Sequence, residues 1–421
     1  MKINQVYEFV NDIYAQATGK NGVTTADAAG LVSIGKDVLS SEANTENFFG
    51  TLVDRIAKSK ISNRPYNARV KSLLMDTFQF GAVLQKIYVA PTEAKESAHW
   101  DVTDGEKSQI YIVKPTVSQK LFSGLTTWEL DTAIPDTQAR SAFTSAEEMA
   151  ALISAIDTAL NNSMNIDLEA MASTVYATMI ANRIIYEKDP DSVRVGTNSN
   201  KKQVVVDLRK GYNTYYGLAS GDTGYLATAA DCKRTPEFYR YASLTIKKFK
   251  NWMNSMSTLY NVPTVTSDGK EFDYYRFTDD TNLNLTIVED FAADFQAHLQ
   301  SEVFHNEFTA LPNYTEVPYW QGSGIANEDT RKISITVESA YNENGDVKKY
   351  TVTQDGVVAI LADVDSMGMT LDNQRIRSVY DNRHEVTAQY AKADKGYFVD
   401  PTENCVVFLV CDEIATPVAA D

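Results

Sequence analysis

One tripeptide in the sequence matches a known catalytic pattern. Asp222-Thr223-Gly224 is the pattern that carries the catalytic carboxylate of aspartic proteases, in which two such carboxylates share one proton. That chemistry needs an apolar strand before the tripeptide and a second copy of it. Here Ala219-Ser220 precede Gly221, and a second Asp-Thr-Gly is missing unless two copies of the chain meet around the first. We therefore predict a polar turn.

A second candidate is a set of metal-ligating residue types at helical spacing. His298, Glu302 and His305 fall at i, i+4 and i+7 on a predicted helix, so imidazole and carboxylate groups would lie near one face. The spacing is not His-Glu-x-x-His, no fourth ligand is evident, and the chain has 4 histidines. We predict a helix edge at a subunit contact, with a divalent metal site as the alternative.

The cysteines predict reduced, buried thiols. Cys232, Cys405 and Cys411 are an odd number in a long chain, which favours thiols over a disulfide framework. Cys405 and Cys411 are on one predicted strand, on the same face but about 20 Å apart, so they cannot bond to each other. Reactive thiols are the less favoured alternative.

No further catalytic motif is found. The phosphate-loop pattern, Gly-x-Gly-x-x-Gly and Gly-x-Ser-x-Gly are absent from the sequence. The paired acids Glu147-Glu148 and Asp279-Asp280 fall at a predicted helix start and in a turn, where the helix dipole and turn propensity explain them. We assign no catalytic, cofactor-binding or metal-binding residue and no cofactor.

Charge and apolar patterning exclude two classes of protein. The 421 residues contain 39 Lys and Arg against 56 Asp and Glu, a net charge of −17, which argues against a nucleic-acid reader. Residues 54–71 are a local basic stretch, predicted to be solvated or to face a partner, with packaged nucleic acid or an acidic neighbour as the alternative. No apolar run approaches the roughly 18 residues of a membrane helix, and no secretory signal is expected.

The first part of the chain predicts short helices followed by a long hairpin. Helices are expected at 3–16 and 25–39, in a segment judged to have little core of its own. Apolar residues then alternate from Phe78 to Val89 and again from Ile110 to Val117, on either side of a charged stretch at 93–107. This pattern indicates two strands with a polar tip, which would need another surface to lie on.

The strongest local signal is a long amphipathic helix. Capping-box spacing at Thr144 and Glu147 is followed by apolar residues every three or four positions as far as Met179. The stripe continues through Asn161-Asn162-Ser163, which are poor helix formers, so we expect a bend or short break there.

The rest of the chain predicts a mixed α+β region. Thr235-Pro236 should begin a helix that ends near Tyr260. A strand at 283–289, a helix at 292–305 and a hairpin of 333–337 with 347–352 are expected next. The apolar runs 357–361 and 405–411 suit strands buried on both faces.

Several segments of the sequence are informative when they are taken together. They are 47–56, 143–186 with Ile166-Asp-Leu-Glu-Ala-Met171, 283–288, 294–299, 303–308, 380–382, 395–397 and 400–409. In this order they resemble bacteriophage major capsid proteins of the Hong Kong 97 fold, especially those of phi-29-like podoviruses and related gut phages. The resemblance spans most of the chain.

The resemblance implies an α+β capsid fold and a shell-forming, non-enzymatic function. Its implied divisions are an N-terminal arm (1–71), an E-loop hairpin (72–128), a peripheral domain with a long spine helix (129–199), an inserted axial domain (200–355) and return strands (356–421). The E-loop, with Phe78, Phe80, Ile110 and Ile112, would lie over a neighbour's spine helix. Implied partners are further copies in pentamers and hexamers, a scaffolding protein, a portal protein and packaged double-stranded DNA. The implied location is the virion, after assembly in the bacterial host cytoplasm.

Some features have no counterpart in that family. No Lys, Asn and Glu set matches the isopeptide cross-link of some relatives, and the 333–352 hairpin and Tyr-rich 211–225 stretch cannot be placed in it. Two alternative functions stay open on sequence alone. One is an acidic cytosolic hydrolase, and the other is a phage tail or surface-binding protein.

Overall fold

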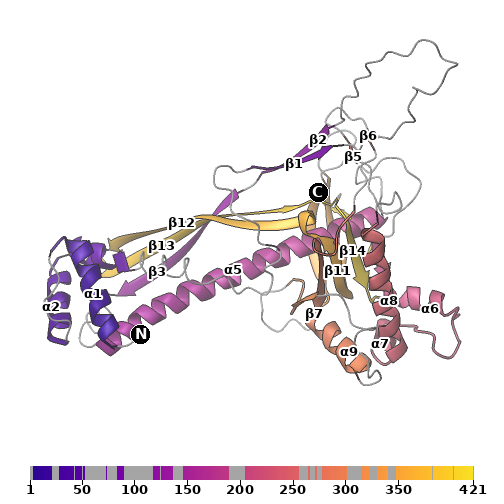
Figure 1. Ribbon diagram of the computed structural model, residues 1–421, viewed down its shortest axis with the longest axis horizontal. Coiled ribbons are helices and arrows are strands. Elements are labelled where there is room, and N and C mark those ends of the chain that lie inside the picture. The colour runs from indigo at the N-terminus through magenta and orange to yellow at the C-terminus, as the bar shows by residue number, and fades with distance from the viewer. Residues whose placement is uncertain are drawn as a thin grey trace, which may run out of the picture.

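The fold is a long helix and a long ribbon that join a small helical bundle to a larger layered α+β body (Figure 1). The computed structural model describes residues 3–20, 28–41, 43–49, 51–52, 73, 83–89, 117–123, 125–135, 146–188, 204–255, 264–265, 271–272, 277–300, 314–321, 330–339, 348–381, 383–401 and 403–420. No helix within these ranges is long and apolar enough to cross a membrane.

The predicted long helix is α5, Ala146–Lys188, which spans 43 residues. At about 1.5 Å per residue it is roughly 65 Å long and runs from the bundle to the body. Its apolar stripe is buried at Leu168, Met171, Val175 and Met179. The break expected at Asn161-Asn162-Ser163 is wrong, because α5 is helical without interruption there.

A five-stranded mixed sheet is the centre of the body, in the order β4-β14-β11-β7-β8. Its strands are β4 Val205–Asp207, β7 Leu283–Val288, β8 Tyr314–Val317, β11 Val357–Asp363 and β14 Cys405–Leu409. β11 and β14 are buried on both faces, as their continuous apolar sequence predicts.

The two faces of this sheet are covered by different helices. Ile360 and Val407 belong to a core shared with α5, whereas Leu361 and Phe408 belong to a second core with α8 and α9. Neighbouring strand residues point to opposite faces, so one apolar run serves both cores. The helices of the second core are α6 Leu208–Tyr215, α7 Ala229–Cys232, α8 Pro236–Met253 and α9 Glu289–Gln300.

The helix boundaries agree with the sequence best where a cap is clear. Thr235 is the N-cap of α8 with Pro236 in its first turn, as predicted. The predicted end near Tyr260 is wrong, since α8 ends at Met253 with Asn254 as C-cap. α9 begins at Glu289 and not at Ala292, because Glu289 and Asp290 suit the positive end of the helix dipole.

A three-stranded ribbon lies along α5, in the order β12-β13-β3 (Figure 1). It consists of β3 Leu125–Pro135, β12 Met367–Asp381 and β13 Val386–Val399, and the short 3-10 helix η3, Val364–Ser366, precedes β12. β12 and β13 were not predicted from the sequence. The turn residues Asp381-Asn382 between two β-rich runs are the signal that could have shown this hairpin.

The smaller sheets complete the body. The predicted hairpin of 333–352 is confirmed as β9 Ile333–Ser339 paired with β10 Lys348–Gln354, and β15 Val418–Ala420 adds an edge strand. β5 Thr264–Val265 pairs with β6 Glu271–Phe272.

The N-terminal segment has a core of its own, contrary to the sequence prediction. α1 Ile3–Thr18 and α2 Ala28–Val38 confirm the expected helices, and residues 43–49 are helical as well. α1 packs against both α2 and α5, and the buried apolar side chains of this segment are Val10, Ile13, Leu31, Ile34, Val38, Phe48, Phe49 and Leu52. A single short helix has too few apolar residues to indicate a core, because the core forms only where several helices pack together. The basic stretch 54–71 lies outside the described residues.

Candidate subunit-contact surfaces

A two-stranded hairpin projects from the body on the side of the ribbon (Figure 1). It consists of β1 Val83–Val89 and β2 Val117–Ser123, which pair antiparallel from Val83 opposite Ser123 to Val89 opposite Val117. β1 confirms the first predicted strand over 83–89, whereas β2 overlaps the second, 110–117, only at Val117. The predicted tip and the apolar residues Phe78, Phe80, Ile110 and Ile112 lie outside the described residues. An isolated hairpin is marginally stable in water, so these strands need a surface to pack on.

The hairpin register sorts its side chains onto two faces. Residues paired across an antiparallel ladder share a face, and alternate residues along each strand face opposite ways. Gln85 opposite Leu121, Ile87 opposite Gln119 and Val89 opposite Val117 therefore form one face. Lys86 and Phe122 belong to the other.

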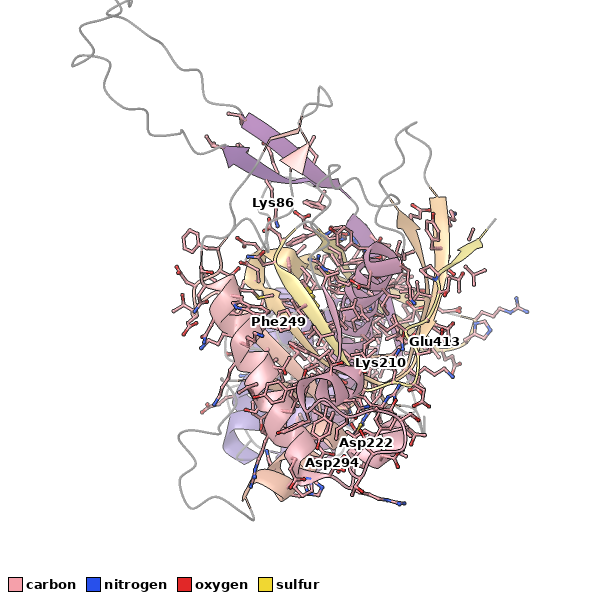
Figure 2. The ribbon with its side chains drawn as sticks, turned by 90° about the vertical axis from the view of Figure 1, so that its right-hand side faces the viewer. Lys86, Lys210, Asp222, Phe249, Asp294 and Glu413 are labelled. Carbon is pink, nitrogen blue, oxygen red and sulfur yellow. The ribbon has the colours of Figure 1, made fainter. Side chains whose placement is uncertain are left out.

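The face with Lys86 and Phe122 is turned to the body of the same subunit. Figure 2 shows Lys86 between the hairpin and the body. The Phe122 ring lies 5.3 Å from that of Phe398 in β13, and the Lys86 ammonium is 5.1 Å from the Phe398 ring centroid. The same ammonium is 3.6 Å from a carboxylate oxygen of Asp400 and 3.7 Å from one of Glu403.

The opposite face, which also holds Gln85 and Gln119, exposes four large apolar side chains to solvent. Its exposed side chains are Ile87 (61%), Val89 (49%), Val117 (48%) and Leu121 (61%). Large apolar side chains contiguous on one strand surface are typical of a surface that another protein covers. This face is the strongest candidate for a subunit contact.

The Lys86 ammonium lies at a turn formed by residues 400–403, where several elements of the fold meet. Arg183 of α5 is 2% exposed and donates to the carbonyl of Glu403, and Lys86 donates to the carbonyl of Asp365. Behind them, Asn404 donates to Thr278 at 3.1 Å, and Thr278 donates to Asp363 at 2.6 Å. Burial raises the pKa of the Asp363 carboxyl above its usual value. Helix, sheet and hairpin are thus joined by one polar network.

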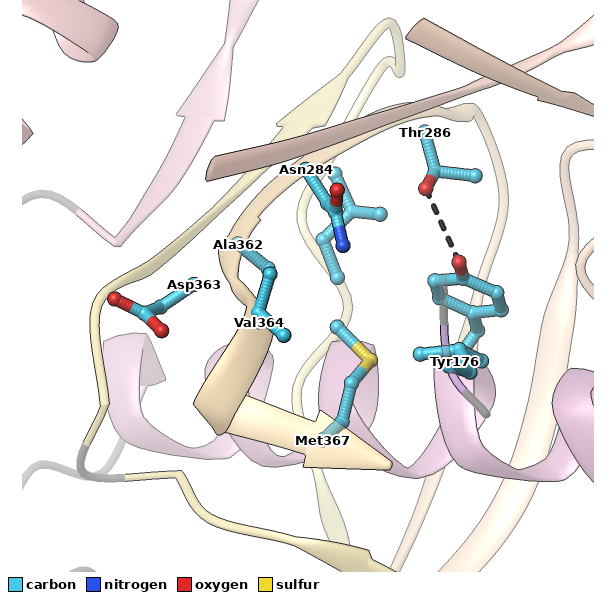
Figure 3. Close-up of a pocket in the computed structure, with 9 residues that line it drawn as sticks. Tyr176, Asn284, Thr286, Ala362, Asp363, Val364 and Met367 are labelled. Atoms are coloured by element: carbon cyan, nitrogen blue, oxygen red, sulfur yellow. Dashed lines mark hydrogen bonds between the residues drawn. The ribbon is translucent and has the colours of Figure 1, made fainter. Parts of the chain in front are cut away.

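A small cavity lies beside this network, between α5, β7 and β11 (Figure 3). Its lining includes Tyr176, whose hydroxyl is 3.1 Å from that of Thr286, together with Asn284, Asp363 and Met367. The space is sufficient for about one water molecule. It is too small to hold an organic substrate.

A partly buried ion pair fixes the ribbon to α5. The Lys395 ammonium of β13 lies 2.7 Å from a carboxylate oxygen of Asp167 in α5. On the other face of β13, Lys392 pairs with Glu129 of β3 at 2.7 Å. Partly exposed pairs of this kind contribute at most about 1 kcal/mol each, so they set the register of the ribbon more than its stability.

Of the candidate residues for catalysis and metal binding, Asp222 and His298 lie in the part of the chain that the structure describes. Asp222 lies in an exposed turn and accepts a hydrogen bond from the Ala219 amide at 2.7 Å, which confirms the predicted turn. His298 stacks on Tyr239 at 4.8 Å, while Glu302 and His305 lie outside the described residues. Within the described part of the chain, no group of His, Cys, Asp and Glu could hold a metal ion.

The thiols of Cys232, Cys405 and Cys411 are all free and buried, as predicted. Desolvation by burial raises the pKa of all three, to about 12 for Cys232 and Cys411. At pH 9 an ordinary thiol is mostly ionised, whereas a pKa of about 12 leaves roughly one part in a thousand as thiolate. These groups are structural and not nucleophilic.

We expect the native subunit to resist thiol alkylation. Iodoacetamide at pH 9 should label no cysteine of the folded chain over a period in which it labels all three after denaturation, because only the thiolate reacts. Mass spectrometry of the intact chain counts the labels. Rapid labelling of the native chain at any of the three positions would contradict the burial described above.

Comparison with known proteins gives the class of protein through a family match. The model of the family described as Phi29-like phage major capsid protein matches residues 8–409. Among solved structures, the chain resembles one from the capsid of Staphylococcus phage Andhra, with 9% identity, a TM-score of 0.49 and coverage of 83% of this chain and 86% of that one. No curated protein sequence matches the chain.

Two further solved structures are similar over most of their length. One comes from the structure of the head fiber and inner core protein gp22 of native bacteriophage P68, with 10% identity, a TM-score of 0.47 and coverage of 83% and 88%. The other comes from the capsid of cyanophage P-SCSP1u, with 8% identity, a TM-score of 0.43 and coverage of 83% and 91%.

The family match over residues 8–409 defines a phage major capsid protein, whose fold combines a long helix, a ribbon, a layered α+β body and a projecting hairpin. The chain belongs to the Phi29-like phage major capsid protein family. Its role is therefore to associate with copies of itself into a capsid shell, and its location is the virion. The family is one of structural proteins, which decides against the hydrolase and the surface-binding alternatives.

Proposed function

We propose that the exposed face of the β1–β2 hairpin is where one subunit packs on its neighbour in the shell. The supporting observation is the row of Ile87, Val89, Val117 and Leu121, of which each is about half exposed or more. Fully burying such side chains stabilises a contact by roughly 1.5–3 kcal/mol each. The contact would bury apolar surface that the isolated subunit leaves exposed.

The domain organisation that we propose follows the family pattern. Residues 1–71 are an N-terminal arm, 72–128 the E-loop, 129–199 the peripheral domain, 200–355 the axial domain and 356–421 the return strands. The contacts of α5 with the ribbon and the pairing of β11 and β14 with β4 and β7 are consistent with this division. The arm contains folded helices and is not an extended segment over its described residues.

The further partners that we propose are a scaffolding protein, a portal protein and packaged double-stranded DNA inside an icosahedral shell of pentamers and hexamers. Assembly takes place in the cytoplasm of the bacterial host. The net charge of −17 supports a weak contact with DNA, because a strongly basic shell would hold the phosphate backbone tightly and impede packaging and ejection.

Electron microscopy of the expressed chain tests the proposal. We expect shells, tubes or discrete capsomers when the chain is concentrated, with the hairpin of one subunit on its neighbour. Particles in which the hairpin face remains open to solvent would contradict the proposed contact. A chain that stays monomeric at high concentration, with and without co-expressed phage proteins, would contradict it as well.

A further inference from the structure

Within the described residues, the extensive contacts of β1 and β2 are with each other. Two side chains of the hairpin whose placement is described join it to the body. Phe122 packs on Phe398, and the ammonium of Lys86 reaches the turn at 400–403. Two strands held in this way can pivot unless one of these contacts fixes their direction.

Lys86 has the geometry of such a fixing contact. Its side chain is 14% exposed, although it belongs to a projecting hairpin, and the Asp400 carboxylate near it is 0% exposed. The ammonium also donates to the carbonyl of Asp365 and lies over the Phe398 ring. Charge-assisted hydrogen bonds are directional, and they are strongest away from water. The contact of Phe122 with Phe398 is apolar and far less directional.

The site that receives Lys86 is itself rigidly placed. Arg183, buried in the middle of the body on α5, donates to the carbonyl of Glu403, and the Asp400 amide donates to the carbonyl of Ser366 at 2.7 Å. The turn at 400–403 therefore cannot shift without disturbing α5 and the start of β12. The position of the Lys86 ammonium is therefore fixed relative to α5.

We propose that Lys86 is a latch that fixes the angle of the hairpin on its own subunit and so presents the apolar face to a neighbouring copy. The hairpin is then aimed before the contact forms, which lowers the ordering cost of association. Lys86 is thus a positioning residue for assembly. This inference rests on the proposed role of the hairpin, but the latch itself is a property of the unassembled subunit.

The test uses Lys86→Met, which keeps an unbranched apolar side chain beside the Phe122 and Phe398 rings and removes the ammonium. Lys86→Arg is the conservative variant. Lys349→Met is the matched control, because Lys349 is also a strand lysine in an ion pair but is 49% exposed. Spin labels at Leu121→Cys on β2 and Leu244→Cys on α8, both exposed positions, report the direction of the hairpin, since the native cysteines are buried.

In the full-length unassembled subunit we expect Lys86→Met to broaden the label-to-label distance distribution and to increase amide exchange in β1 and β2 at least tenfold. Lys86→Arg and Lys349→Met should match the parent chain. An unchanged distribution and unchanged exchange in Lys86→Met would overturn the latch. The role of the hairpin in assembly is judged separately, by substitution of its exposed face, so failure of one proposal is distinguishable from failure of the other.

Discussion

The double substitution Ile87→Asp with Leu121→Asp is expected to abolish shell formation while the subunit still folds. Each side chain is 61% exposed in the monomer, so the change costs the isolated chain little. In the assembled shell each substitution removes roughly 2 kcal/mol of apolar burial and places a carboxylate in a dry contact. The penalty applies to every copy, so assembly should fall below detection by electron microscopy and sedimentation.

The control keeps the chain apolar at the same two positions. Ile87→Val with Leu121→Met alters shape but not polarity, and we expect it to assemble with at most a modest loss of yield. Circular dichroism and thermal unfolding of the unassembled subunits should show that the aspartate variant is folded. Normal shells from a folded aspartate variant would show that this face is not a subunit contact.

Gly356→Ala is expected to destabilise the folded subunit by roughly 4 kcal/mol, because it combines backbone strain with a backbone clash. Gly356 has φ +76°, and its carbonyl accepts the Val410 amide at 2.7 Å beside the irregular register of β11 and β14. A methyl group there would lie 2.8 Å from the carbonyl carbon of Val410 and closer still to its oxygen. The two central strands would have to separate.

Gly217→Ala is the matched control for this prediction. Gly217 has φ +65°, close to that of Gly356, but an added methyl group meets no atom within 4 Å. We expect a cost of about 1 kcal/mol for the left-handed backbone alone. Denaturant unfolding of the unassembled subunits measures both free energies of unfolding. Equal losses for the two variants would show that contact with the Val410 carbonyl adds nothing to the cost of a side chain at position 356.

The sequence predicted the elements that carry their own local signal. The long helix follows from an apolar residue every three or four positions, and the start of α8 follows from Thr235 before Pro236. The buried strands β11 and β14 follow from continuous apolar runs. The unbroken path of α5 through Asn161-Asn162-Ser163 shows the opposite case, in which packing overrides poor helix propensity.

The candidate subunit contact was predicted only in part. Alternating apolar residues predicted the strands of the hairpin and included Ile87, Val89 and Val117, which are exposed on one face. Lys86 gave no sequence signal, because a lysine on a strand normally points to solvent. Its partner Asp365 is 279 positions away in the chain, and Arg183 is 220 positions from Glu403.

By itself, the sequence determined the family, the acidic balance and the elements with a strong local signal, such as α5, α8, β11 and β14, because these depend on residue types and on spacing within a few turns. Only the tertiary structure decided that the N-terminal helices share a core and that a buried turn receives Lys86. It also showed which face of the hairpin is left exposed. The physical reason is that burial and charge pairing are properties of segments brought together from distant parts of the chain.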